Sequence, residues 1–259
     1  RMLQDEASRR CKSMEREIDD QLSEARYPSR ARDIIDDAVK LGVGVLKGPL
    51  TSSNPTRRWT KQEDGSFVLD TRPDPRPDFR RVNPWHFFPD PDATEMQDCE
   101  STLERHILNR SALRRMAKRL EWNEETVNKI IASEPLATHD ADFNWLTQLR
   151  TIEQDAENAV INRYTVWEYH GPLLKTEIIN LLRASGRDED AMAFNDDCCD
   201  DYEERMVICY FSQGRLLKLE EYFPLDRGSS LYSVFSFEKG EASVLGAVGV
   251  PNLMRHEQS

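Results

Sequence analysis

The sequence has no apolar run approaching the ~20 residues that cross a bilayer as a helix, and no signal peptide. We therefore expect no membrane partner. Its 35 basic residues are outnumbered by 47 acidic ones, which gives a net charge of −12. A free-standing duplex-binding domain needs a basic footprint to neutralise phosphates, so that class is disfavoured. The hydrophobic share of 38% indicates an elongated subunit or a piece of an assembly.

Cysteine is also scarce. The chain has five, an odd number, and no pair with two residues between them. Cys198 and Cys199 are adjacent, and neighbours in sequence rarely bridge because a disulfide needs separated Cα atoms. The sequence therefore predicts reduced thiols in an intracellular protein.

The usual catalytic motifs are missing as well. The sequence contains no HExxH, GxSxG, P-loop or GxGxxG. Its histidines look scattered along the chain: His86, His106, His139, His170 and His256. We therefore expect no enzyme, no cofactor and no resident metal.

The most unusual stretch runs from residue 81 to 94. It combines aromatic rings, prolines and acidic residues: Pro84, Trp85, Phe87, Phe88, Pro89, Asp90 and Asp92. Proline lacks an N–H and fixes its φ angle, so a rigid, irregular segment is expected. The prediction is that Trp85, Phe87 or Phe88 anchors it in the core, while Asp90 and Asp92 make turns and caps.

Residues 1–50 are expected to form two helices and one strand. An apolar stripe at spacings of three or four predicts a helix over 3–26, broken at Tyr27-Pro28-Ser29. A second helix follows, with Gly42 as its left-handed C-terminal residue. Residues 43–47 are expected to be a buried strand that Gly48-Pro49 stops.

Residues 51–78 are expected to be a hairpin and a proline-rich linker. Asp64-Gly65 is a turn signal, and proline at every second position of 72–78 is typical of an extended linker. The body, 79–250, is expected to be α+β, with helices packed on mixed or antiparallel strands and hairpins, and 251–259 the start of a truncated helix.

Within the body, strands are expected at 79–82, 101–108, 159–169, 205–211, 215–222 and 231–237. Asn109 or Ser111 is expected to cap a short helix, Asn123 the next one, and 136–158 a further turn or two. A helix is expected over 173–184, ended by Gly186, after a strand that Gly171-Pro172 stops. The acid-rich residues 188–204 are expected to be a solvated loop.

Two charged groups are candidates for function. Arg114, Arg115, Lys118 and Arg119 are expected on the outer face of the first short helix, where they could contact DNA or a neighbouring acidic subunit. Asp90, Asp92, Glu95 and Asp98 are oxygen ligands at short spacing, which suits Mg²⁺ or Ca²⁺. An alternative function is therefore a carboxylate, metal-dependent nuclease-like enzyme centred on these four.

Several stretches together resemble portal proteins, the head-to-tail connectors of tailed bacteriophages, most closely the short-tailed type. The most specific is Pro84-Trp85-His86-Phe87-Phe88-Pro89-Asp90-Pro91-Asp92-Ala93. The others are 41–49, the strand and basic helix from Glu104, 166–172, 232–238 and 246–255. They span residues 31–255.

The resemblance implies a wing-like portion of a non-enzymatic subunit in a dodecameric ring at the capsid vertex of the virion, assembled in the host bacterial cytoplasm. Double-stranded DNA passes through such a ring during packaging and ejection. Terminase, scaffolding or capsid proteins and tail adaptor proteins bind it. Both ends of the sequence look cut, so a fragment is expected. A ring of −12 subunits would present strong negative potential.

Overall fold

The chain opens with a helix that has almost no packing of its own. In the computed structural model, which describes residues 2–62, 65–133, 163–195, 202–221, 231–241, 243–246, 249–251 and 254, α1 spans Met2–Glu24. Every residue from 6 to 21 is exposed, including Met14 and Ile18 of the predicted stripe. Near its C-terminal end, Glu24 pairs with Arg76 at 2.9 Å. The helix was predicted correctly, but its apolar stripe is not buried.

The second helix, α2 (Tyr27–Leu41), packs on strand β1 (Val43–Lys61). Ile34 and Ala38 are buried beneath it. The two backbones approach so closely that a Cβ on Gly44 would lie 2.2 Å from the Ile34 carbonyl oxygen, so only glycine fits. Asp37, also buried, accepts two hydrogen bonds from the Arg81 guanidinium, which ties the helix to the next strand.

Two details of this region differ from the prediction. Tyr27-Pro28 does not break a helix; it starts one, because proline is well suited to a first helical turn, and the turn lies at Arg26, with φ 56°. Gly48-Pro49 does not stop the strand, which continues past a register shift between Lys47 and Leu50. Gly42 does end α2, with φ 98°, as predicted.

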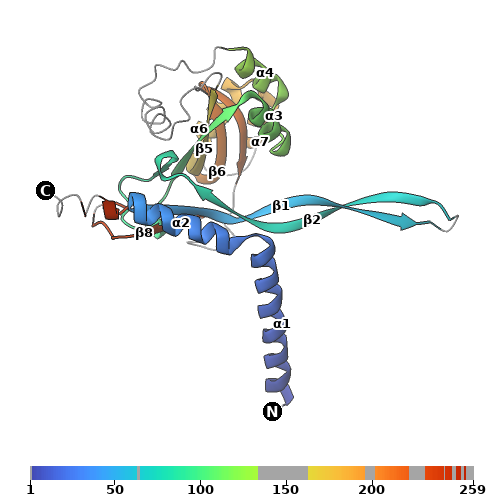
Figure 1. Ribbon diagram of the computed structural model, residues 1–259. Coiled ribbons are helices and arrows are strands. Elements are labelled where there is room, and N and C mark those ends of the chain that lie inside the picture. Colours follow the sequence, from blue (N-terminus) through green and yellow to red (C-terminus); the bar gives the residue numbers. More distant parts are fainter. Residues whose placement is uncertain are drawn as a thin grey trace, which may run out of the picture. The chain divides into compact units, whose positions relative to one another are not determined.

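Strand β1 and strand β2 (Phe67–Val82) form one long antiparallel hairpin, seen in Figure 1. Only the base of β1, Val43–Lys47, pairs with β8 (Tyr232–Ser236), so the three-stranded sheet has the order β2-β1-β8. We call residues 48–62 and 65–78 the arm. Gly65, with φ 86°, lies in the turn that Asp64-Gly65 predicted.

The proline-rich segment is extended but is not a linker. Its residues pair with β1, and Pro73 lies opposite Pro55. Two opposed prolines have no N–H to exchange, so we infer that this pair is of the non-hydrogen-bonded kind, with both backbones facing outward. Pro75 and Pro77 share the phase of Pro73, so their missing N–H groups also fall on the outer edge of β2. Prolines at an edge leave the inner ladder intact and block further pairing.

The second sheet is a five-stranded antiparallel meander in the order β3-β4-β5-β6-β7. Its strands are β3 (Phe87–Pro89), β4 (Thr102–Asn109), β5 (Arg163–Leu174), β6 (Glu204–Ser212) and β7 (Arg215–Glu221). The chain therefore combines helices with antiparallel sheets, the α+β class expected from the sequence.

Helices cover both faces of this sheet. On one face, α3 (Arg110–Arg119) and α4 (Glu124–Ala132) pack around Val166 and Tyr210. On the other, α6 (Lys175–Ala184) and α7 (Asp188–Asn195) pack around Val207 and Leu219. Val166 belongs to the first cluster, and Tyr169 packs against the second. Because these two side chains point to opposite faces of one strand, the two clusters are separate cores.

Local capping follows the sequence closely in this sheet's helices. Asn109, one of the two residues expected to cap α3, accepts from the backbone N–H of Ala112 at 2.8 Å. Asn123 caps α4 by accepting from Glu125 and Thr126. Asn side chains at these positions satisfy N–H groups that the first helical turn leaves unpaired.

Two further expectations for this region were wrong. Gly171-Pro172 does not end β5, which continues to Leu174 and pairs with β6 from Trp167 to Leu174. Residues 188–195 are not a loop: α7 forms there because Ala191 packs into the second core and three acidic residues occupy its first turn, where the helix dipole favours negative charge. The expected helical turns at 136–158 lie outside the described residues.

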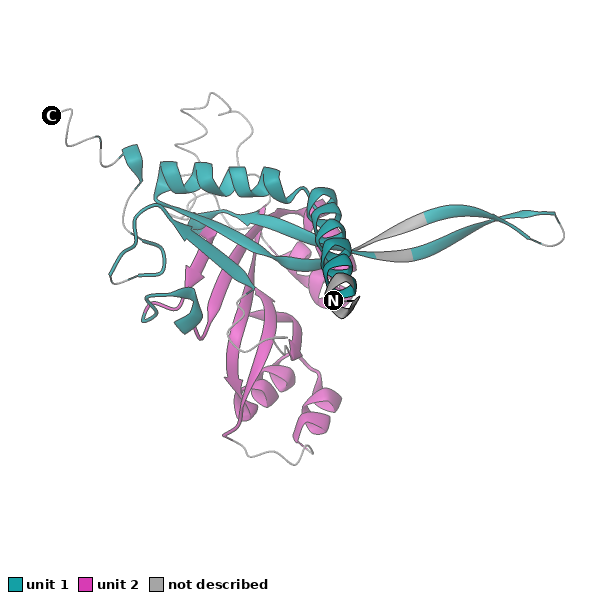
Figure 2. Cartoon of the chain, turned by 90° about the horizontal axis from the view of Figure 1, so that it is seen from below, with its two compact units in different colours: residues 1–85, 92–98, 228–259 teal, residues 86–91, 99–227 magenta. Residues whose placement is uncertain are grey.

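By its internal contacts the chain divides into two units, coloured separately in Figure 2. Unit 1 comprises residues 1–85, 92–98 and 228–259; unit 2 comprises 86–91 and 99–227. The aromatic stretch is therefore shared. It contains η1 (Pro84–His86) and β3, and η2 (Met96–Asp98) follows it.

Phe87 is the buried aromatic of that stretch. Its side chain is 1% exposed, whereas Trp85 is 55% exposed. Of the three candidate anchors, the structure therefore selects Phe87. Phe88 lies on the outer part of the sheet, 5.7 Å from the Trp167 ring.

We predict that Phe87→Ala lowers the free energy of unfolding by ~3–5 kcal/mol, because it removes a fully buried ring and leaves a cavity. Trp85→Ala is the matched control and should change stability by no more than about 0.5 kcal/mol, as is usual for an exposed position. Urea denaturation of both variants measures the difference. Equal losses would contradict the assignment of Phe87 as the anchor.

Candidate functional site

Unit 2 contains a polar network on one face of its sheet. Glu104 on β4 lies directly opposite Glu168 on β5, and Glu168 lies opposite Tyr210 on β6. Because side chains alternate along a strand, His106 and His170 lie on the same face as these three. The network thus forms from two copies of the pattern Glu-x-His on neighbouring strands.

Glu168 is the centre of this network. Its Oε2 lies 2.7 Å from His106 Nε2, and its Oε1 lies 2.8 Å from His170 Nε2. Tyr210 donates its hydroxyl to Oε1 at 3.0 Å. A buried carboxylate is stable only when hydrogen bonds or opposite charges compensate its lost hydration, and here side chains from three strands supply them.

Glu104 and Tyr210 complete the network. Glu104 Oε1 lies 3.6 Å from His106 Nδ1. Burial, and next the charge of Glu168, raise the pKa of Tyr210, so its hydroxyl stays protonated and can donate. Among the residues that the structure describes, the group formed by Glu104, His106 and Glu168 is the one whose potential ligand atoms lie within 4.8 Å of one another.

This network was missed from the sequence. The five histidines were read as scattered, yet His106 and His170 meet at one carboxylate. Part of the signal was present: the strand expected at 101–108 carries Glu104-x-His106, whereas the strand expected at 159–169 contains Glu168 and ends one residue before His170. The missing information was the register, which places residue 104 against residue 168.

The opposite face of the sheet carries an aromatic cluster. The Arg105 guanidinium lies 5.8 Å from the centroids of both the Phe88 and the Trp167 rings. Such cation–π contacts favour a fixed arginine over aromatic faces. Phe88 therefore has a structural role despite its exposure.

The carboxylates predicted as a possible metal site do not form such a group. Asp90 belongs to unit 2, and Asp92, Glu95 and Asp98 belong to unit 1. No three of their ligand atoms gather within 4.8 Å in the described part of the chain. Glu95 instead pairs with Lys239 at 3.1 Å.

The predicted basic residues do share one exposed surface. Arg114, Arg115, Lys118 and Arg119 are all exposed on α3, opposite the buried Leu113 and Ala117. The helix therefore presents the basic face that the sequence predicted.

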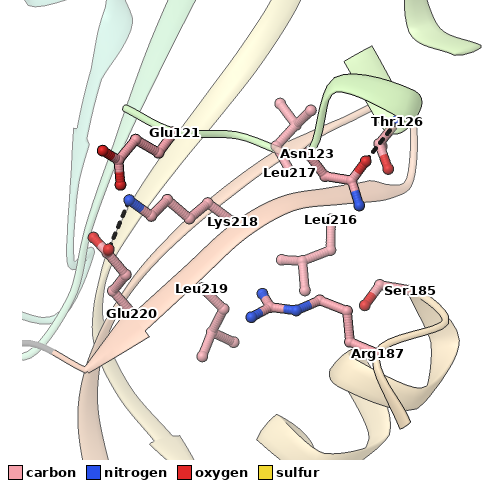
Figure 3. Close-up of a pocket in the computed structure, with 10 residues that line it drawn as sticks. All are labelled: Glu121, Asn123, Thr126, Ser185, Arg187, Leu216, Leu217, Lys218, Leu219 and Glu220. Carbon is pink, nitrogen blue, oxygen red and sulfur yellow. Dashed lines mark hydrogen bonds and ion pairs between the residues drawn. The ribbon is translucent and has the colours of Figure 1, made fainter. Parts of the chain in front are cut away.

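Figure 3 shows a cavity of about 370 Å³ beside strand β7. Its polar side chains already serve the fold. Ser185 donates its hydroxyl to the Leu182 carbonyl oxygen at 2.7 Å, and Arg187 pairs with Asp190 at 2.6 Å. Lys218 pairs with Glu220 at 2.6 Å, a contact drawn in the figure. The lining includes no histidine or cysteine.

Unit 1 carries a different kind of candidate site, at the distal end of the arm. Residues 57–62 and 65–69 are all exposed. Trp59 and Phe67 are 65% and 63% exposed, and Leu69 lies opposite Trp59. These exposed apolar side chains make the distal end of the arm a candidate contact surface.

None of the helices in the described residues is long and apolar enough to cross a membrane.

We predict that His86 makes the protein less stable as the pH falls. Burial, with the nearby charges of Arg105 and His106, lowers the pKa of His86 to about 4, below its usual 6.5. Between these values the unfolded chain binds more protons, so stability rises with pH across that window and is complete above it. His86→Gln should flatten the dependence between about pH 4 and 6.5 in urea denaturation. An unchanged slope would show that His86 does not contribute.

Comparison with known proteins adds no relative. No family model matches the sequence, and no curated protein matches it significantly.

Proposed function

We propose that this chain is a structural subunit of a bacteriophage portal ring. In that role it forms part of the conduit through which DNA enters and leaves the capsid, and part of the platform for terminase, capsid or scaffolding, and tail proteins. The virion's portal vertex is then its place of action. The proposal is supported by the resemblance centred on Pro84–Ala93, and it is compatible with the α+β fold.

The observation that carries the assembly part of this proposal is the exposure of α1 and the arm. A two-stranded hairpin is marginally stable alone in water, and an isolated helix gains most of its stability from packing. Here both expose apolar side chains, among them Met14, Ile18, Trp59 and Phe67. Neighbouring copies in a ring would cover these surfaces.

Charge is a second support for a repeated subunit. The net charge of −12 coexists with the basic face of α3, so opposite charges are available for contacts between copies. Charge complementarity of this kind fixes orientation more than it adds affinity. The same basic face could contact the DNA backbone, with no sequence preference.

The carboxylate-enzyme alternative is not proposed, because its four acidic residues do not gather in the described part of the chain. Asp92→Asn should accordingly leave assembly and packaging intact. A nuclease activity that requires a divalent ion and disappears in that variant would favour the alternative.

We predict that negative-stain imaging of the full-length protein reveals ring particles, and that the double variant Trp59→Ser, Phe67→Ser reduces them. The variant removes exposed rings from the arm, so monomer stability should change by no more than about 0.5 kcal/mol per site. Mass photometry gives the fraction of assembled protein.

Tyr202→Ser is the matched control, because Tyr202 is even more exposed than Trp59 and Phe67 but lies in unit 2, not on the arm. It should leave the rings unchanged. A protein that stays monomeric at all concentrations would contradict the portal assignment. Rings that form equally well in the arm variant would contradict the role given to the arm.

A further inference from the structure

We propose that Glu104, His106 and Glu168 form a binding site for a first-row divalent metal ion, with Zn²⁺ as the ion it fits. Their ligand atoms lie within 4.8 Å of one another. All three project from adjacent strands of one sheet, which fixes their spacing. This inference does not depend on the portal assignment.

The charges of the site favour a divalent cation. Glu104 and Glu168 are directly opposite on paired strands, and like charges in that arrangement destabilise a sheet. Both are buried, where screening by water is weak. A divalent ion between two carboxylates and a neutral imidazole makes the group electrically neutral.

The ligand types narrow the choice of ion. Two carboxylates with one imidazole form a mixed oxygen and nitrogen set, which suits zinc and its neighbours, whereas Ca²⁺ and Mg²⁺ prefer oxygen alone. Three protein ligands leave the fourth position of a tetrahedral zinc ion for water.

The contact between His106 and Glu168 needs only a small adjustment. His106 Nε2 and Glu168 Oε2 lie 2.7 Å apart, a hydrogen-bonding distance. In tetrahedral zinc coordination two such atoms would be roughly 3.3 Å apart, so the ion would replace the proton between them. Glu104 has to move further, because its Oε1 now lies 3.6 Å from the other ring nitrogen, His106 Nδ1; its carboxylate would turn toward the ion.

The remaining members of the network would position Glu168. His170 Nε2 and the Tyr210 hydroxyl both contact Oε1, which leaves Oε2 directed at His106. Such outer contacts orient a metal ligand and commonly change affinity by about 10- to 100-fold. His106 is the most exposed of the three ligands, with 19% of its side chain accessible against 10% and 5% for Glu104 and Glu168, so it marks the side from which an ion enters.

The test is titration of the whole 259-residue chain, stripped of metal, with ZnSO₄ in an isothermal calorimeter. We expect one zinc ion per chain and a higher melting temperature after binding. His106→Asn should weaken binding at least about tenfold, and Tyr210→Phe about tenfold. Co²⁺ substituted for zinc reports the ligands through its visible absorption, which His106→Asn should change.

Two variants serve as controls. Asp92→Asn removes a carboxylate from the sequence-predicted acidic group, and Glu220→Gln removes one from β7. Both should bind zinc as the parent chain does. Circular dichroism establishes that each variant is folded, and His106→Asn is the most tolerant choice because its side chain is the least buried of the ligands.

Two results would overturn the proposal: no saturable heat of zinc binding, or binding that His106→Asn leaves unchanged. In either case the network is one of hydrogen bonds without a metal ion. Loss of zinc binding would leave ring formation unaffected, so failure of this proposal and failure of the portal assignment are separable.

Discussion

The pairing of Glu168 with side chains of three strands is the constraint on which the centre of unit 2 depends. A carboxylate buried in a sheet is costly unless each oxygen has a partner. Here the partners come from β4, β5 and β6, so the hydrogen bonds exist only when all three strands have their observed register. A slip of one residue would turn each of these side chains to the other face. The hydrogen bonds of the polar network therefore help to fix the register of these three strands.

Much of the fold could be predicted from the sequence because local chemistry decided it. The asparagine caps before α3 and α4, the glycine after α2 and the hairpin turn at Gly65 each act within a few residues. Several of the errors share one cause. Proline and glycine at 48–49, 72–77 and 171–172 were read as interruptions, but at a bulge, at a strand edge or near a strand end they cost few hydrogen bonds.

The candidate sites likewise differ in whether a local sequence pattern determines them. The basic face of α3 depends on helical periodicity, which sequence displays directly. The network around Glu168 depends on which residues face each other across β4 and β5, and no local pattern determines that register. Phe87 falls between these cases: the sequence limited the anchor to three aromatic residues, and tertiary packing chose among them.

The prolines of β2 also determine where along the arm another backbone can pair. Over residues 73–77 the outer edge of β2 has no N–H groups to offer at alternate positions, whereas residues 57–61 and 67–71 keep theirs. The apolar side chains Trp59, Phe67 and Leu69 belong to that same distal part. Hydrogen-bonding capacity and apolar surface thus coincide near the tip, while the outer edge of β2 is blocked over residues 73–77. Along β2, the backbone can therefore pair with a further strand near the tip of the arm, and the prolines prevent such pairing over residues 73–77.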